Sequence, residues 1–174
     1  MLNGTPTRTH RARIGGEDSG CGVDTVREGE GTMQGAEERW GTPVIRTDFS
    51  DEAAWVAVCA ALQAPDAESG YEADVTCRSD PRYAGLTAEG VAGLLPHGPL
   101  EFMFIVDRLT LTHPERPLLA VDLGDAPGRS FRAIPSAVAA IEANLSIANI
   151  NFAEYADYAA ATWPDGIHRG FRYP

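Results

Sequence analysis

"EFMFIVD" (101–107) is the stretch that decides the fold class of this 174-residue chain. Its five central residues are all apolar and stand between two acidic residues. A run of this length is too short for a typical helix, and it has no polar face that could meet water. Such a run is typical of a strand that is buried on both faces in the middle of a sheet.

Further elements are predicted on both sides of this strand. Other strands are expected at 44–47, 71–80, 117–123 and 129–134. Helices are expected from a Ser50 cap to a stop at Pro65, within 86–96 with Thr87 as the cap, and twice after Pro135. The order β-α-β-α-β-β-β-α-α predicts an α/β (or α+β) fold: a single compact domain with a mixed central sheet of about five strands flanked by helices, two of them near the C-terminus.

Three asparagines interrupt the last helical region, "EANLSIANINFAEYADYA" (142–159). Asn149 suits a left-handed position that closes one helix, and Asn151 with Glu154 suits a capping box that opens the next. Asn144 falls in mid-helix, where asparagine competes for backbone hydrogen bonds. On one continuous helix Asn144 and Asn151 would lie on the same side, so a ligand-binding row and a structural tie both remain open.

Residues 1–40 differ from the rest of the chain. They are rich in glycine and poor in apolar residues, so we expect a flexible leader before a single α/β domain at 41–174. Met33 is an alternative start, which would leave residues 1–32 untranslated. The first residues include arginines but no apolar run behind them, which argues against a secretory signal, and no stretch is long enough to span a membrane. These features predict a cytoplasmic protein without membrane contact.

The net charge of the chain indicates which classes of partner it can bind. The formal net charge is −11, from 14 basic and 25 acidic residues, and every basic residue is arginine. An acidic chain repels a phosphate backbone, so nucleic acid is not an expected partner. The absence of lysine excludes Schiff-base catalysis and lysine-dependent phosphate sites. Three cysteines, Cys21, Cys59 and Cys77, form no pair at metal-ligand spacing and are expected to be reduced thiols.

Two carboxylates stand where two predicted strands end. Asp48 follows the first strand and Asp107 follows "FMFIV". If those strands are parallel, both carboxylates emerge at the sheet edge where open α/β folds bind ligands, with Arg46, Arg108 and Asp122 as further members. Such a group would suit Mg²⁺ or acid–base catalysis. The alternative is that Asp48 belongs to a turn and Asp107 pairs with a surface arginine.

The histidines and loops contain few candidates for catalysis or ligand binding. His168, next to Arg169 in "GIHRGF", is either a general base or anion contact, or a surface residue near the chain end. No histidine pair has metal-ligand spacing, and no known nucleophile or nucleotide motif is present, so no motif requires a cofactor. "TLTHPERPLL" (110–119) is predicted to be a proline-rich loop that either binds a ligand or is a solvated connection.

Four segments carry a family resemblance. They are "RTDFSDEAAWVAVCAAL", "FIVDRLTLTHPERPLLAVDL", "GRSFRAIPSAVAAIEANLSIANINFAEYAD" and "GIHRGF". In these segments the chain resembles an uncharacterised domain family found mostly in actinobacteria, over about residues 43–171. The resemblance implies one compact bacterial domain, and it implies neither an activity nor a catalytic residue.

Three functions are compatible with the sequence. The first is a small acidic binding or regulatory module that recognises a protein partner, a basic one in view of the charge. The second is a small-molecule enzyme that uses Asp48, Asp107 and an arginine, with or without Mg²⁺. The third is a small-molecule binding protein whose pocket is lined by the Asn144 and Asn151 face.

Overall fold

The computed structural model describes residues 41–66, 69–95 and 100–172, in which helices flank a six-stranded sheet, as in the predicted α/β class. The leader predicted at 1–40 lies outside the described residues. The elements are β1 (Thr42–Arg46), α1 (Glu52–Leu62), β2 (Val75–Arg78), η1 (Pro81–Tyr83), α2 (Ala88–Ala92), β3 (Phe102–Val106), α3 (Arg108–Thr112), β4 (Leu118–Asp122), β5 (Ser130–Ala133), α4 (Pro135–Ser146), α5 (Phe152–Thr162) and β6 (Ile167–His168). None of the helices in these ranges has the length and apolar character that a bilayer crossing requires.

The sheet is mixed, as predicted, and its strand order is β2-β1-β3-β4-β5-β6. β1 pairs in parallel with both β2 and β3. β4 is antiparallel to β3 and to β5, and β6 is parallel to β5. The chain leaves β1 for β2 on one side and later returns to β3 on the other. The strand order therefore reverses beside β1, which places a topological switch point between the carboxyl ends of β1 and β3.

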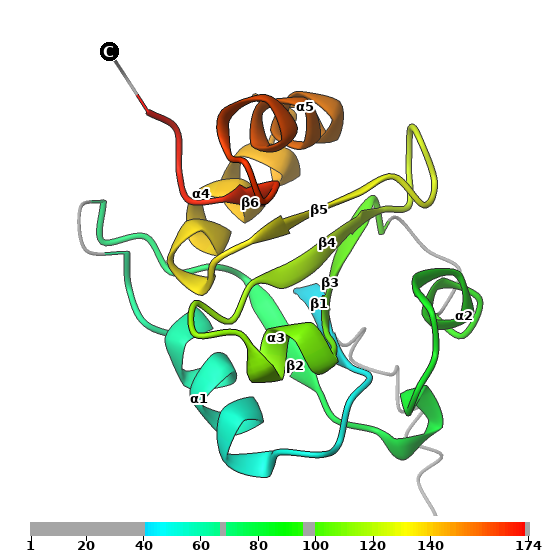
Figure 1. Ribbon diagram of the computed structural model, residues 1–174. Coiled ribbons are helices and arrows are strands. Elements are labelled where there is room, and N and C mark those ends of the chain that lie inside the picture. The colour runs from blue at the N-terminus through cyan, green and yellow to red at the C-terminus, as the bar shows by residue number, and fades with distance from the viewer. Residues whose placement is uncertain (1–40, 67–68, 96–99, 173–174) are drawn as a thin grey trace, which may run out of the picture. The chain divides into compact units, whose positions relative to one another are not determined.

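Helices cover both faces of the sheet (Figure 1). Phe104 of β3 belongs to the core beneath α1, α4 and α5, whereas Met103 and Ile105 belong to the core beneath η1 and α2. All three side chains are almost fully buried. This double burial confirms the prediction from "FMFIV" and explains why the strand has no polar position.

The sequence patterns missed the strand β6, the α-helix α3 and the short 3-10 helix η1. β6 has only two residues and pairs with Arg132 and Ala133 of β5, so it is too short to show an alternating pattern. The prediction of a loop at 110–119 was wrong at its start, because α3 occupies Arg108–Thr112. Asp107 caps this helix by a capping box with Thr110, and the helix ends before the His113–Pro114 pair.

Helix starts were predicted more accurately than helix ends. Thr87 caps α2, and Asn151 with Glu154 forms the predicted capping box of α5. The cap of α1 is Asp51 and not Ser50, since the Asp51 carboxylate accepts from the Ala54 N–H at 2.8 Å. Ser50 instead donates its backbone N–H and its hydroxyl to Asp48 Oδ1.

The end of α4 differs from the prediction by one residue. Ala148, not Asn149, takes the left-handed conformation, with φ of 53°. Asn149 donates its N–H to the Asn144 carbonyl at 2.9 Å and its side-chain amide to Asn144 Oδ1 at 2.6 Å. The two asparagines therefore close the helix together, and this closure forces an alanine into a conformation that favours glycine.

We expect Ala148→Gly to raise the free energy of unfolding by about 1 kcal/mol, because glycine adopts positive φ without strain. Chemical denaturation measures the change. Ala143→Gly, inside α4, is the matched control and should lower the free energy of unfolding by a similar amount. A loss of stability in both variants would contradict the strain assigned to Ala148.

Candidate functional site

The sheet edge at the carboxyl ends of β1 and β3 holds the two carboxylates predicted from the sequence. Arg46 of β1 lies opposite Val106 of β3 in the parallel register, so Asp48 and Asp107 follow neighbouring strands at the same edge. The Thr47 N–H donates to the Val106 carbonyl at 2.9 Å, which keeps the two chains side by side beyond the strands. The structure therefore brings both residues to the edge that the sequence predicted.

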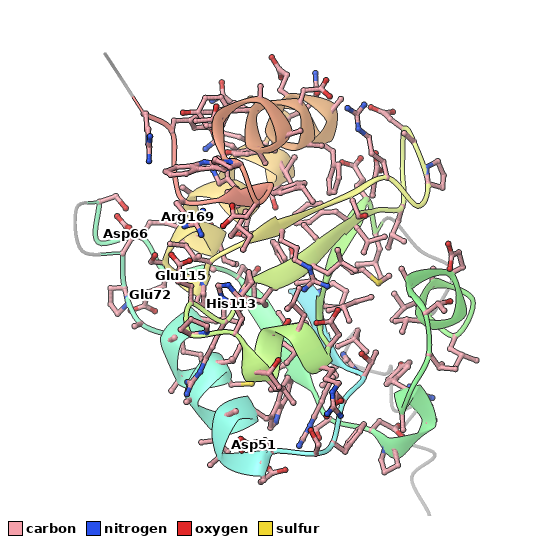
Figure 2. The ribbon with its side chains drawn as sticks, in the orientation of Figure 1. Asp51, Asp66, Glu72, His113, Glu115 and Arg169 are labelled. Carbon is pink, nitrogen blue, oxygen red and sulfur yellow. The ribbon has the colours of Figure 1, made fainter. Side chains whose placement is uncertain are left out.

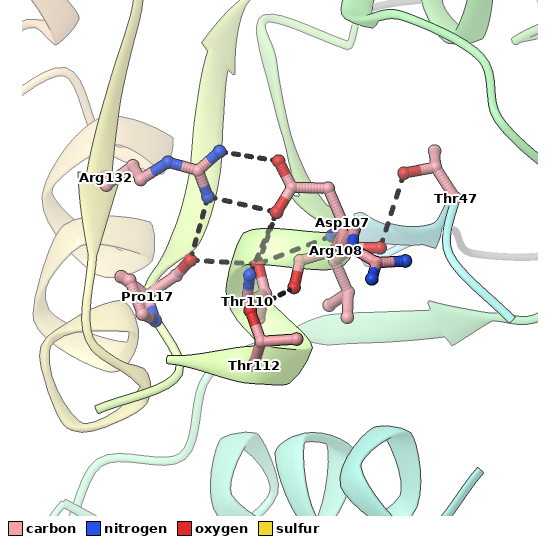
Figure 3. Close-up of polar contacts among 8 residues, drawn as sticks. Thr47, Asp107, Arg108, Thr110, Thr112, Pro117 and Arg132 are labelled. Carbon is pink, nitrogen blue, oxygen red and sulfur yellow. Dashed lines mark hydrogen bonds and ion pairs between the residues drawn. The ribbon is translucent and has the colours of Figure 1, made fainter. Parts of the chain in front are cut away.

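Asp107 is fully engaged by its neighbours (Figure 3). Arg132 of β5 donates Nη2 to Oδ2 at 2.5 Å and Nη1 to Oδ1 at 3.2 Å. Oδ1 also accepts from the Thr110 N–H at 3.0 Å and from the Thr110 hydroxyl at 3.1 Å. Arg132 in turn donates to the Pro117 carbonyl at 3.1 Å. This network joins the β3–α3 junction to β5.

The network sets the protonation state of Asp107. Burial alone raises the pKa of this carboxyl, but the donors from Arg132 and Thr110 outweigh burial and hold the pKa below its usual value. A carboxylate in this state stays ionised at neutral pH and has a bidentate arginine on it. Its contacts therefore indicate that Asp107 holds the start of α3 against β5, and not that it transfers a proton.

Asp48 has a different environment. It accepts hydrogen bonds from Ser50, which are the main cause of its lowered pKa, and Arg108 and Arg46 add a smaller electrostatic contribution. Arg108 itself is exposed. Among the described residues, no group of three or more His, Cys, Asp or Glu side chains is arranged to hold a metal ion. Asp122 lies at the opposite edge, because β4 runs antiparallel and pairs Asp122 with Phe102.

Arg46 is a buried anchor for the start of α1. Only 1% of its surface is exposed. Nη1 pairs with Glu52 Oε2 at 2.5 Å, and Nε donates to the Asp48 carbonyl at 2.9 Å. The guanidinium also lies 4.5 Å from the centroid of the Phe49 ring and 5.4 Å from that of Trp55. These contacts fix the first turn of α1 against β1.

The two asparagines predicted to line a pocket separate in the structure. Asn151 lines a cavity of about 230 Å³ at the end of β4, together with Asp122 and Phe152. Asn144 does not line this cavity. Its side-chain amide donates to the Ala140 carbonyl at 2.7 Å. A row of asparagines on one helix face does not form, because α4 and α5 are separate helices.

His168 is buried and not a surface residue of the chain end. It is 2% exposed, and its ring meets Phe131, Tyr155, Tyr158 and Phe171 with centroid separations of 5.3 to 6.2 Å. Nδ1 is buried without a hydrogen-bond partner among the described residues. This burial lowers the pKa of His168 to about 4, so the ring is neutral at neutral pH.

The two described cysteines are free thiols, as expected. Cys59 of α1 and Cys77 of β2 are half-buried and pack against the same core. A hydrogen bond between the two thiols raises the pKa of Cys59 and lowers that of Cys77.

The exposed side of α1 is a feature that the predicted site residues did not include. The inner side packs Trp55, Val58 and Leu62 into the core. The opposite side carries Ala53, Val56, Ala57 and Ala60. Val56 is 56% exposed, Ala53 and Ala60 are exposed, and Ala57 is partly exposed. We call these four residues the outer α1 face.

The sequence contained a signal for this face. Between Glu52 and Asp66 the chain has no charged residue. A surface helix normally alternates apolar and polar faces at a period of 3.6 residues, and α1 has apolar residues on both faces.

Comparison with known proteins agrees with a domain of unassigned activity. No curated protein matches the chain at a significant level. One family model covers most of the described structure, from the residue before β1 to the aromatic residue that packs against His168. The chain belongs to the family described as Domain of unknown function (DUF6924), whose model matches residues 41–171.

Proposed function

We propose that this domain is a noncatalytic module that binds a protein partner through the outer α1 face. The observation that carries the proposal is the exposure of Val56 and its alanine neighbours on a helix that is apolar on both sides. A helix of this kind is normally buried on all sides. No other element of the described ranges covers this apolar helix face, and an uncovered face of this kind is typical of a protein interaction surface.

The small side chains of the outer α1 face favour contact with another helix. Ala53, Val56, Ala57 and Ala60 follow the spacing i, i+3, i+4, i+7, so they form one stripe along the helix. The distance at which two helices pack depends on the side chains between them, and alanine allows a close approach. A partner helix would bury the stripe along most of α1.

The face is held in place before any partner arrives. Arg46 and the Asp51 cap fix the first turn of α1, and Trp55, Val58 and Leu62 fasten its inner side to the core. A surface that is already ordered loses little conformational entropy on binding. This rigidity supports a binding role for α1.

The enzymatic alternative has less support. It needs Asp107 to bind a metal ion or move a proton, and that carboxylate already accepts four hydrogen bonds from Arg132 and Thr110. The small-molecule alternative needs Asn144 and Asn151 in one pocket, and only Asn151 lines the cavity near them.

We expect Val56→Asp to weaken partner binding at least about tenfold, because the new carboxylate must lose its water at the centre of the interface. The free energy of unfolding should change by no more than about 0.5 kcal/mol, since Val56 is exposed in the free domain. Co-purification of the tagged chain from its own cells, followed by size-exclusion chromatography, measures the first effect. Urea denaturation measures the second.

Leu94→Asp is the matched control. Leu94 is 47% exposed and follows α2, which covers the other sheet face. The Leu94→Asp variant should retain the partner. Equal retention of a partner by both variants would place the interface elsewhere.

A further inference from the structure

We propose that the partner presents an amphipathic helix whose apolar stripe is flanked at both ends by basic residues. This inference rests on the proposed function, because it concerns the same outer α1 face. It adds the chemistry of the occupant, which the exposure of the face does not specify. The charges around α1 indicate this chemistry.

The segment that contains α1 carries charges of one sign. Residues 47–77 include seven acidic residues and no Arg, Lys or His. Asp51 and Glu52 stand at the N-terminal end of α1 and are exposed, and Asp66 follows its C-terminal end. Figure 2 shows Asp51 at one end of the helix and Asp66 and Glu72 toward the other. The apolar stripe therefore has acidic residues beyond both ends.

Arg46 does not reverse this charge pattern. Its side chain is buried and is paired with Glu52, whose own side chain remains 74% exposed. The surface at this end of α1 therefore still includes Asp51 and its neighbouring carboxylates. Opposite charges across an interface speed association and exclude partners of the wrong sign.

A second copy of this chain fits the face poorly. In an antiparallel pair of α1 helices, Asp51 and Glu52 of one copy would approach Asp66 of the other. In a parallel pair, Asp51 and Glu52 would approach the same residues of the second copy. Both arrangements bring carboxylates together, and like charges across an interface are destabilising. A basic partner avoids this repulsion.

The dimensions of α1 set the pattern expected in the partner. α1 has 11 residues, so its length is about 16 Å at 1.5 Å per residue. A partner helix that packs along it would carry apolar residues at i, i+3, i+4 and i+7. Its lysines or arginines would lie just beyond this stripe, within reach of Asp51 at one end and Asp66 at the other.

The test uses the full chain and three synthetic helical peptides. The peptides share one leucine and alanine stripe, and they carry lysine, glutamine or glutamate at the flanking positions. Fluorescence anisotropy gives Kd for each peptide at low and high salt. Protein variants are Val56→Asp, the matched control Leu94→Asp, and the double variant Asp51→Asn with Asp66→Asn. Asparagine keeps the cap and turn hydrogen bonds of both positions while it removes the charge.

The expected result is that the lysine peptide binds at least about tenfold more tightly than the glutamate peptide. This preference should shrink at high salt, because exposed charges are screened. It should also shrink several-fold in the double variant, and Val56→Asp should weaken binding whereas Leu94→Asp should not.

Two other results overturn the inference in different ways. Equal affinity for all three peptides, with loss of binding in Val56→Asp, would overturn the basic partner and leave the outer α1 face as the docking surface. Binding of the lysine peptide that Val56→Asp does not change, or no binding of any peptide, would overturn the docking surface as well.

Discussion

Between about pH 7 and pH 4 the free energy of unfolding should fall by about 3 kcal/mol through His168 alone. The burial of this ring lowers its pKa to about 4 in the folded chain, against a usual value of 6.5. As the pH falls below 6.5, the unfolded chain takes up a proton at this position and the folded chain does not. The stabilising contribution is therefore complete above pH 6.5 and is lost progressively toward pH 4.

The position of His168 makes this effect large. The ring lies among Phe131, Tyr155, Tyr158 and Phe171, and no carboxylate contacts it among the described residues. A protonated imidazole at this place would be a buried charge without a counter-ion. Acid should therefore loosen the packing of β6 and α5 before it affects the opposite face of the sheet.

Denaturant titrations at several pH values, with the wild type and His168→Phe, measure the effect. The wild-type curve should lose about 3 kcal/mol more than the variant curve over this pH range. His168→Gln is a second control. It removes the aromatic ring as well as the titratable group, so it separates the effect of the proton from the effect of the new phenylalanine ring. Parallel pH curves for the wild type and both variants would contradict the buried neutral state.

The second large effect concerns Asp107. We expect Asp107→Ala to lower the free energy of unfolding by about 3 kcal/mol, because it removes the cap of α3 and leaves the Arg132 guanidinium without its carboxylate. Asp107→Asn should cost less, since asparagine can cap the helix but cannot form the ion pair. Urea denaturation of both variants measures the difference.

A double-mutant cycle isolates the ion pair. Arg132→Leu alone should also destabilise the chain, and Asp107→Asn combined with Arg132→Leu should cost less than the sum of the two single changes. The depressed pKa of Asp107 gives a further check, because its contribution is present above its unfolded pKa and is lost as the pH falls below that value. Additive costs in the cycle would mean that Asp107 and Arg132 do not act together in the solution structure.

The features that the sequence predicted well are local ones. The strand "FMFIV" carries its own signal of double burial, and the capping box of Asn151 and Glu154 depends on residues three positions apart. Thr87 as a cap has the same origin. Each of these structures is decided by neighbouring residues, so a pattern in one short stretch is sufficient.

The features that the sequence missed depend on particular contacts and not on a repeated pattern. β6 exists because Arg132 and Ala133 offer it a free strand edge. Ala148 takes positive φ because the amide pair of Asn144 and Asn149 closes α4 at that point. The β6 pairing is a tertiary contact, whereas the Asn144–Asn149 contact spans only five residues. In both cases the contact overrides the intrinsic preference of the residue.

The same distinction applies to the candidate site. The sequence placed Asp48 and Asp107 at one sheet edge, because strands that run in parallel end at the same edge. It could not supply the partner of Asp107, since Arg132 lies 25 residues away and on a different strand. The outer α1 face also required the structure, because a run of apolar residues does not reveal which side of a helix is covered.

The most direct test of the partner-binding role is photo-crosslinking from position 56 in the cells that make this protein. A photoreactive amino acid at position 56 should give one discrete adduct with a second polypeptide, and the same amino acid at position 94 should not. The adduct should also disappear when Ala60→Asp is added, because Ala60 lies one turn further along the outer α1 face. The same adducts from both positions, or no discrete adduct from position 56, would contradict the assignment of α1 as the docking surface.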